Sequence, residues 1–300
     1  MVRPKHGSVS AIASAVFLPV LLALACSSVT ATSVAPGKYF VWRVTNVPVP
    51  FYLIGSIHNL SARDYPLPEV YRIALTNSQR LLFECSPREQ TALTQKFREA
   101  AKYPIGQDIE SELRPEVVGL IKKNEWRLRM KFDQLRHYRP WAIGLMLLAE
   151  RGPVGPSSPR SMDNYLSREA QRAGKEVAGL ETVDEHVAFW REMLERDGEN
   201  LLLYTLTHKE TVGLLLDKTR ETWKRGDVAG LSATNARLRR ANPAIAQRLL
   251  DRRNVRWVTR IEAEMQTGKP TAIVAGAGHF SGRGSVIALL KEHGYTLEQL

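Results

Sequence analysis

Cysteine is scarce in this chain, and three common catalytic motifs are missing from it. Two cysteines among 300 residues can build neither a disulfide framework nor a zinc site of four thiolates. The chain has no His-Glu-x-x-His motif, no P-loop and no Gly-x-Ser-x-Gly elbow. These absences argue against zincins, P-loop nucleotidases and serine α/β-hydrolases. A disordered chain is also excluded, because 44% of the residues are hydrophobic.

Residues 1–37 have the pattern of an export signal followed by a tether. Arg3 and Lys5 form a basic head, and residues 11–25 carry no charge. This apolar run is too short for an ordinary membrane span and is typical of a secretory signal. We therefore predict a signal peptide over 1–25 and a flexible tether over 26–37. The protein is expected in the periplasm or attached to the bacterial cell envelope.

Cys26 follows the apolar run directly, in Leu-Ala-Leu-Ala-Cys. This ending resembles a bacterial lipobox, in which the cysteine would be lipidated and would anchor the chain to a membrane. A plainly cleaved signal and an uncleaved anchor are the alternatives.

Positive charge exceeds negative charge, with 42 Lys and Arg against 31 Asp and Glu, a net charge of +11. This excess favours an anionic surface, an acidic ligand or a nucleic acid as partner. Residues 237–256 are rich in arginine, but an exported chain rarely meets nucleic acid. We expect no nucleic-acid partner and interpret the stretch as a solvated helix face or a contact with an anionic envelope.

Strand and helix patterns alternate along the rest of the chain. Tyr39–Thr45 and Phe51–Ile57 predict a hairpin, and three short apolar runs are typical of buried parallel strands. These runs are Arg80–Cys85, Lys175–Leu180 and Thr271–Ala275. Helices are predicted over 67–78, 88–102, 114–126, 139–151, 161–173, 183–197, 199–225, 227–239, 243–266 and 284–293, followed by an edge strand over 295–300. Thr182 and Glu185 match a capping box at the start of one helix.

The expected fold class is α/β, with a mostly parallel central sheet, an N-terminal hairpin, flanking helices and a large helical insertion. Because the first and last strands must meet in one sheet, we expect a single discontinuous domain over 38–300. Its sheet segments are 38–86, 175–181 and 270–300, and its helical insertion covers 87–174 and 182–268.

Imidazoles and carboxylates stand at the ends of four predicted strands. Each histidine follows a glycine by three residues, and each glutamate ends a short apolar run; the four are His58, Glu84, Glu181 and His279. The carboxyl ends of parallel strands meet at one edge of a sheet, where ligands bind. Because imidazole and carboxylate are ligands of first-row divalent metals, the set predicts a metal site.

The glycines before the histidines have a physical reason to be there. Gly55, Gly276 and Gly278 lack a Cβ, so the backbone can approach a ligand closely or adopt a positive φ. Alone, each histidine could be a hydrogen-bonded structural residue, and Glu181 could simply be a negative charge that stabilises the N-terminus of the next helix. The repeated glycine–histidine spacing at two strand exits favours a shared site.

Taken in order, these motifs resemble the TraB/PrgY/GumN family, in its bacterial GumN-like type. The resemblance lies in Phe51–Leu60, Tyr65–Pro68, Leu81–Glu84, Gly179–Thr182, Gly276–His279 and Gly282, and extends to Arg253-Asn254. It implies a fold akin to the ChaN and erythromycin-esterase group. It also implies kinship with the Tiki proteins, described as metal-dependent proteases built on paired Gly-x-x-His motifs and a glutamate. The chain departs from the family pattern at Ser56, where threonine is commoner, and at Cys85-Ser86.

The resulting hypothesis is a divalent-metal-dependent, peptidase-like hydrolase. His58 and His279 would hold Mn²⁺, Co²⁺ or Zn²⁺, with Glu181 or Glu84 as a further ligand. The ion would make water acidic, and the remaining glutamate would accept the proton. Arg253 would orient a carboxylate or stabilise negative charge; alternatively, it is a surface arginine in a basic helix.

Two readings without catalysis stay open. One is a binding protein that sequesters a peptide, glycan or haem-like ligand in the same cleft. The other is a scaffold for envelope assembly. For the hydrolase, the expected partner is a peptide or another small substrate of the envelope.

Overall fold

The computed structural model describes residues 37–149, 161–207, 209–241 and 243–300. The predicted signal peptide, Cys26 and nearly all of the predicted tether lie outside these residues. Within the described ranges, no helix combines the length and the apolar character that crossing a membrane requires.

Six strands form one sheet, in the order β4-β3-β5-β2-β1-β6. Their bounds are β1 Val41–Val44, β2 Phe51–Ser56, β3 Arg80–Cys85, β4 Glu176–Glu181, β5 Thr271–Gly276 and β6 Leu297–Gln299. Strands β4, β3, β5 and β2 are mutually parallel, while β1 pairs antiparallel with both β2 and β6. The predicted α/β class, with its mostly parallel sheet and N-terminal hairpin, is confirmed.

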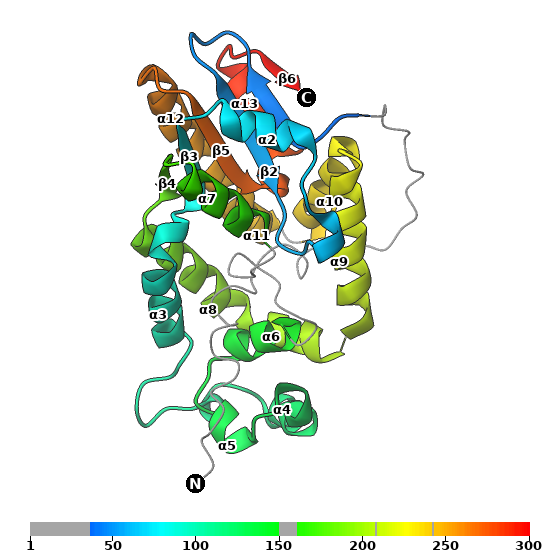
Figure 1. The fold of residues 1–300 in the computed structure, drawn as a ribbon. Helices are drawn as coiled ribbons and strands as arrows, with labels where there is room; N and C mark the ends of the chain where they lie inside the picture. The colour runs from blue at the N-terminus through cyan, green and yellow to red at the C-terminus, as the bar shows by residue number, and fades with distance from the viewer. Residues whose placement is uncertain (1–36, 150–160, 208, 242) are drawn as a thin grey trace.

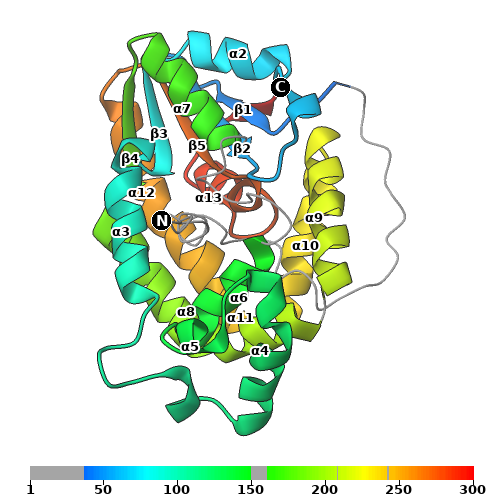
Figure 2. The same ribbon diagram turned by 60° about the horizontal axis from the view of Figure 1, so that its bottom comes forward.

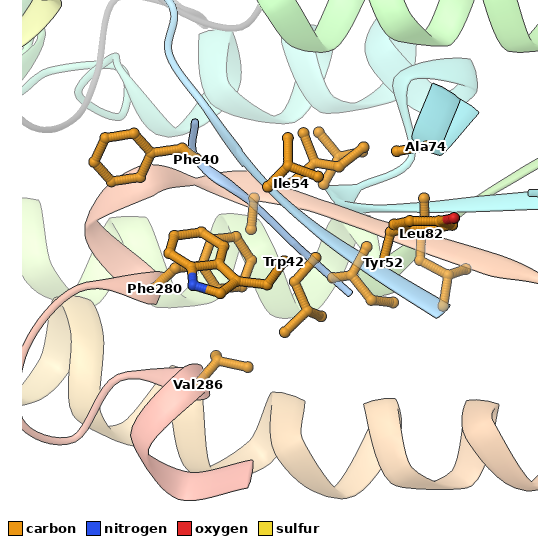
Figure 3. Close-up of a cluster of buried hydrophobic side chains, with 14 of the residues drawn as sticks. Phe40, Trp42, Tyr52, Ile54, Ala74, Leu82, Phe280 and Val286 are labelled. Carbon is orange, nitrogen blue, oxygen red and sulfur yellow. The ribbon is translucent and has the colours of Figure 1, made fainter. Parts of the chain in front are cut away.

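Helices cover both faces of the sheet, and this explains the continuous apolar runs of the central strands. All six residues of β2 and the first five of β5 are buried. Ala74 of helix α2 (Glu69–Thr76) packs on one side of the strands, and Val286 of helix α13 (Val286–Glu292) lies on the other (Figure 3). Trp42 and Phe280 fill the space on the α13 side (Figure 3), whereas the hydroxyl of Tyr52 accepts a hydrogen bond from Asn77 at the end of α2 at 3.0 Å.

Some of the remaining helices lie beneath the sheet as drawn in Figures 1 and 2, and others pack on its faces or lie beside it. They are α3 Gln90–Ala100, α4 Pro115–Leu128, α5 Phe132–Leu135, α6 Pro140–Ala149, α7 Met162–Arg172, α8 Val183–Thr207, α9 Lys209–Lys224, α10 Val228–Ala241, α11 Pro243–Ala246 and α12 Arg252–Gln266. Helices α3 to α6 and α8 share a second apolar core that includes Trp141, Trp190 and Leu202. Since β3 and β4 lead into α3 and α8, the carboxyl ends of these strands face this helical part (Figure 1).

Three helix predictions, 183–197, 199–225 and 243–266, were wrong in their bounds. Helix α8 continues through Gly198 to Thr207, whereas the sequence suggested a break before 199. A Cβ on Gly198 would lie 3.0 Å from the Cβ of Trp141, so this glycine permits close packing of α6 instead of ending the helix. The predicted helix over 243–266 is divided by a π-helical segment, Gln247–Asp251, of a kind frequent at functional sites.

The predicted capping box at the start of α8 is confirmed. The Glu185 N–H donates to Thr182 Oγ1 at 3.2 Å, and the Thr182 N–H donates to Glu185 Oε2 at 2.9 Å. Replacing Thr182 by alanine should lower the free energy of unfolding by about 1 kcal/mol, measured by urea denaturation. Thr91→Ala, on the exposed surface of α3, is the matched control and should change it by less than about 0.5 kcal/mol. Equal losses in both variants would contradict the capping role.

Candidate functional site

The four parallel strands deliver the predicted site residues to one edge of the sheet. Strands β2 and β5 are direct neighbours, with Ser56 opposite Gly276, and β3 and β4 are neighbours with Cys85 opposite Glu181. His58 follows β2, and β5 leads into a buried 3₁₀ turn, Ala277–Phe280, that contains His279. The topology therefore places both histidines and both glutamates along the same edge.

Arg253 lies in contact with three of these residues, Glu84, Glu181 and His279. Its Nε donates to Glu181 Oε1 at 2.8 Å, and its Nη2 donates to Glu181 Oε2 at 2.9 Å and to Glu84 Oε2 at 2.7 Å. The side chain is 1% exposed, so the alternative of a surface arginine was wrong. Its guanidinium also lies 4.5–5.8 Å from three aromatic ring centres, those of Phe189, Trp190 and Trp257. Paired carboxylates and aromatic faces are the surroundings that best stabilise a buried arginine.

Both oxygens of Glu181 are occupied by donors. Besides Arg253, Trp257 Nε1 donates to Oε1 at 3.0 Å, and His186 Nδ1 lies 2.8 Å from Oε2. Trp190 Nε1 donates to His186 Nε2 at 2.9 Å; indole only donates, so the ring proton of a neutral His186 is on Nδ1 and faces Glu181. Burial alone would raise the pKa of Glu181, but Arg253 and His186 hold it well below its usual range. This carboxylate is therefore saturated and poorly suited to bind a metal or to accept a proton.

Glu84 is bound less completely. Its Oε1 accepts the N–H of Gly276 at 2.8 Å, and Arg253 takes its Oε2. Burial would raise the pKa of Glu84, but the charges of Arg253 and His279 and the Gly276 N–H lower it to about 2. The side chain is 19% exposed, against 3% for Glu181. Glu84 is thus an ionised carboxylate with capacity left for a further ligand.

Close approach, rather than a positive φ, accounts for two of the motif glycines. A Cβ on Gly276 would lie 3.3 Å from Glu84 Oε1, and a Cβ on Gly55 would lie 3.0 Å from the Cβ of Phe40. Positive φ angles occur at other glycines of the described chain, but not at Gly55, Gly276 or Gly278. The missing Cβ of Gly276 therefore leaves room for the carboxylate of Glu84 beside the end of β5.

The ring of His279 is held in one tautomer. Asn254 Nδ2 donates to the carbonyl oxygen of Gly284 at 2.8 Å, which turns Asn254 Oδ1 toward His279 Nδ1 at 2.6 Å. Nδ1 must then carry the proton, and Nε2 keeps a lone pair. Burial and the charge of Arg253 lower the pKa of His279 to about 4, although Glu84 and Glu181 act in the opposite direction. His279 Nε2 lies 3.4 Å from Arg253 Nη1 and 3.9 Å from Glu84 Oε1.

His58 is paired with an aspartate that the sequence analysis did not single out. His58 Nδ1 lies 3.1 Å from Asp163 Oδ2, and Ser56 Oγ donates to Asp163 Oδ1 at 3.2 Å. Burial lowers the pKa of His58, but the charges of Asp163 and Glu84 outweigh this effect and raise it overall. Glu84 thus acts electrostatically on both histidines.

The residues that the sequence analysis missed lie in helices, not at strand ends. Asp163 stands in the first turn of α7 and His186 in the first turn of α8. The available signal at Asp163 is the preceding Ser161, which caps α7 by accepting the Asn164 N–H. That pattern predicts a helix start and says nothing about His58.

The donor chemistry of the site fits a divalent metal ion in part. Within the described ranges, no three His, Cys, Asp or Glu side chains are placed to share one ion. Yet both histidines have Nδ1 beside a side-chain oxygen, the arrangement typical of metal-bound histidine. In addition, the carboxylates of Glu84 and Glu181 share the single guanidinium of Arg253, and the buried carboxylate of Asp163 faces His58. His58, His279 and Glu84 fit a cation in donor type and charge, whereas Glu181 does not.

Comparison with known proteins supports a distant kinship with metalloproteases. The chain is 23% identical over 260 residues to YbaP of Escherichia coli, covering 85% of this chain and 94% of YbaP. It is 24% identical over 310 residues to Metalloprotease TIKI1 of Danio rerio, covering 86% of this chain and 62% of that protein. It is also 24% identical over 339 residues to the Metalloprotease TIKI homolog of Amphimedon queenslandica, covering 95% of this chain and 66% of the relative.

The chain therefore spans less than two thirds of the zebrafish protein. No solved structure matches the chain. The TraB/PrgY/gumN family model matches residues 40–299, which include every strand of the sheet and both glycine–histidine motifs. The protein is a member of the TraB/PrgY/gumN family.

Proposed function

We propose that this protein is a divalent-metal-dependent hydrolase of the peptidase type, with its centre at the carboxyl edge of the parallel strands. The observation that carries the proposal is the fixed tautomer of His279, whose Nε2 lies 3.9 Å from Oε1 of the ionised Glu84 and 3.4 Å from Nη1 of Arg253. The names of the TIKI relatives, which describe metalloproteases, support the same chemistry.

His58, His279 and Glu84 would hold the ion. When bound, a divalent ion supplies Lewis-acid chemistry: it lowers the pKa of water, so that hydroxide is available to attack an amide near neutral pH. Imidazole and carboxylate suit Mn²⁺, Co²⁺ and Zn²⁺ alike, so the donor set leaves the identity of the metal open. Glu181, which we had expected as an alternative ligand, is left out of the set because its oxygens are taken.

The other residues of the site orient this set. Asn254 keeps the proton of His279 on Nδ1, and the Gly276 N–H together with Arg253 holds the carboxylate of Glu84 in place. Glu181 in turn fixes Arg253 through Nε and Nη2. Because those donors are committed, Nη1 of Arg253, which lies 3.4 Å from His279 Nε2, is the nitrogen that would interact with a substrate carboxylate or with developing negative charge.

Metal analysis together with peptide hydrolysis by the purified protein tests this proposal. We expect about one divalent ion per chain and hydrolysis of a fluorogenic peptide library, with both lost in His58→Ala and His279→Ala. His293→Ala is the matched control, because His293 is an exposed histidine that pairs with Glu262 and with none of the cluster residues. Hydrolysis that survives both site substitutions would overturn the proposal, and so would a wild-type protein that binds no metal and cleaves no peptide.

One observation favours a second candidate, a binding protein that sequesters a peptide, glycan or haem-like ligand without catalysis. Arg253 Nη1 already lies beside His279 Nε2, and within the described residues no three ligands converge. Ligand binding that persists in His58→Ala and His279→Ala, without bound metal, would support this candidate over the hydrolase.

Export to the cell envelope is part of the proposal and rests on residues 1–37 of the sequence. We expect the mature chain to begin at or near Cys26 and to fractionate with the periplasm or the membrane. Labelling with a fatty acid, lost in Cys26→Ala, would identify the lipid-anchored form. An unprocessed chain in the cytoplasm would contradict export.

A further inference from the structure

We propose that Asp163 is the positioning residue of His58 and, together with Ser56, fixes the ring so that Nε2 is its ligand-binding nitrogen. This inference rests on the proposed function, because Nε2 acts as a ligand only if the site holds a metal ion. The contacts themselves are independent of it.

The contact between Asp163 and His58 is exclusive on both sides. His58 Nδ1 and Asp163 Oδ2 lie 3.1 Å apart; both atoms are buried, and neither has a hydrogen bond elsewhere among the described residues. The two atoms lie within the distance of an ion pair but do not form a regular hydrogen bond. Removing either side chain would leave the other atom buried without a partner, which is costly.

Asp163 is anchored to the strand that delivers His58. The hydroxyl of Ser56, the last residue of β2, donates to Asp163 Oδ1 at 3.2 Å, and the N–H of Met162 donates to the carbonyl oxygen of Ile57 at 3.2 Å. These two bonds tie the first turn of α7 to the two residues immediately before His58. The Asp163 carboxylate is therefore fixed in position beside the His58 imidazole.

The ordinary reason for an aspartate at this position explains less. An acidic residue in the first turn of a helix is favoured by the helix dipole, by about 0.3–1 kcal/mol. That role would be served by a carboxylate directed at the free N–H groups of α7. Instead, both oxygens of Asp163 are directed at side chains that come from β2 and its exit, so its contacts serve the site rather than the helix.

With Nδ1 facing a carboxylate, a neutral His58 carries its proton there and presents a lone pair on Nε2. His279 reaches the same state through Asn254. The two histidines of the repeated glycine–histidine motif are therefore set by different residues, an aspartate in α7 and an asparagine in α12.

Nitrogen NMR of histidine-labelled protein, combined with calorimetric titration of Mn²⁺ and Zn²⁺, tests the inference. In the wild type, His58 should be found with its proton on Nδ1, its signal assigned through His58→Gln. Asp163→Leu should remove this preference and weaken metal binding by about 10- to 100-fold. Asp163→Asn, which keeps an oxygen acceptor, should restore part of both effects, and Ser56→Ala should produce a smaller change in the same direction.

Asp64→Leu provides the matched control. Asp64 is a buried carboxylate that pairs with Lys224 at 2.8 Å and accepts the Ser61 N–H at 2.6 Å, but it has no contact with His58. It should lose stability while leaving the His58 signal and the metal affinity unchanged. If Asp163→Leu leaves the His58 tautomer unaltered, or weakens metal binding no more than Asp64→Leu does, the positioning role is wrong. If the tautomer changes as expected while the wild type binds no metal, the positioning role stands and the proposed hydrolase fails.

Discussion

Replacing Arg253 by methionine is expected to lower the free energy of unfolding by about 3–5 kcal/mol. Methionine keeps much of the length of the side chain but removes the donors that serve Glu84 and Glu181. Both glutamates would then be left at a poorly exposed site without their counter-ion. Urea denaturation of the wild type and the variant under identical conditions measures the difference.

Arg72→Met is the matched control for this prediction. Arg72 makes an ion pair with Glu69 on the exposed surface of α2, where solvent screening leaves a pair little effect on stability. A loss below about 1 kcal/mol for Arg253→Met, or a loss equal to that of Arg72→Met, would contradict the structural importance of the buried network.

A double variant separates the charge from the packing. If uncompensated carboxylates dominate the loss, Arg253→Met combined with Glu181→Gln should be more stable than the sum of the two single variants indicates. A coupling of about 1 kcal/mol or more is expected for residues in direct contact. Additive losses would assign the effect to the aromatic contacts of Arg253 instead.

The central strands could be predicted from the sequence because their burial on both faces leaves a local record. Arg80–Cys85 has the observed bounds of β3, since its apolar run ends at a serine and a proline, where the 3₁₀ turn after the strand begins. The order of the strands has no such record. That β5, near the end of the chain, lies between β2 and β3 follows from pairing across the whole fold.

Helix boundaries were less predictable because tertiary packing overrides local preference. Gly198 has the local character of a helix end, but its missing Cβ is used for contact with Trp141 inside a continuous helix. The π-helical segment before Arg253 likewise has no periodic signal that distinguishes it from the flanking α-helix.

The candidate site was predictable to the extent that its residues stand at strand ends. His58, Glu84, Glu181 and His279 share that position, and the parallel topology brings it to one edge. The partners that decide what each residue can do come from helices. Arg253 saturates Glu181, and Asp163 pairs with His58. The partners of these two contacts lie 72 and 105 residues apart in the sequence, and no local pattern connects them.

Gly179→Ala is expected to cost about 2–3 kcal/mol of stability and to disrupt the site at the same time. A Cβ on Gly179 would lie 2.6 Å from the carbonyl oxygen of Glu181 and 2.8 Å from the backbone nitrogen of Ser86. Both are backbone atoms, so the chain itself must move, and it must move where β4 and β3 deliver Glu181 and Glu84. Thermal unfolding and metal titration of the same variant measure both effects.

Gly119→Ala makes this prediction specific, because the same substitution should there act in the opposite direction. Gly119 lies inside α4 with no atom within 4 Å of an added Cβ, and alanine in a helix is favoured over glycine by about 0.5–1 kcal/mol. The control should therefore raise the melting temperature and leave metal binding intact. A Gly179→Ala variant that is as stable as the wild type, with unchanged metal affinity, would show that the exits of β3 and β4 can shift without cost. The tight backbone packing at Gly179 would then not be what holds the two glutamates in place.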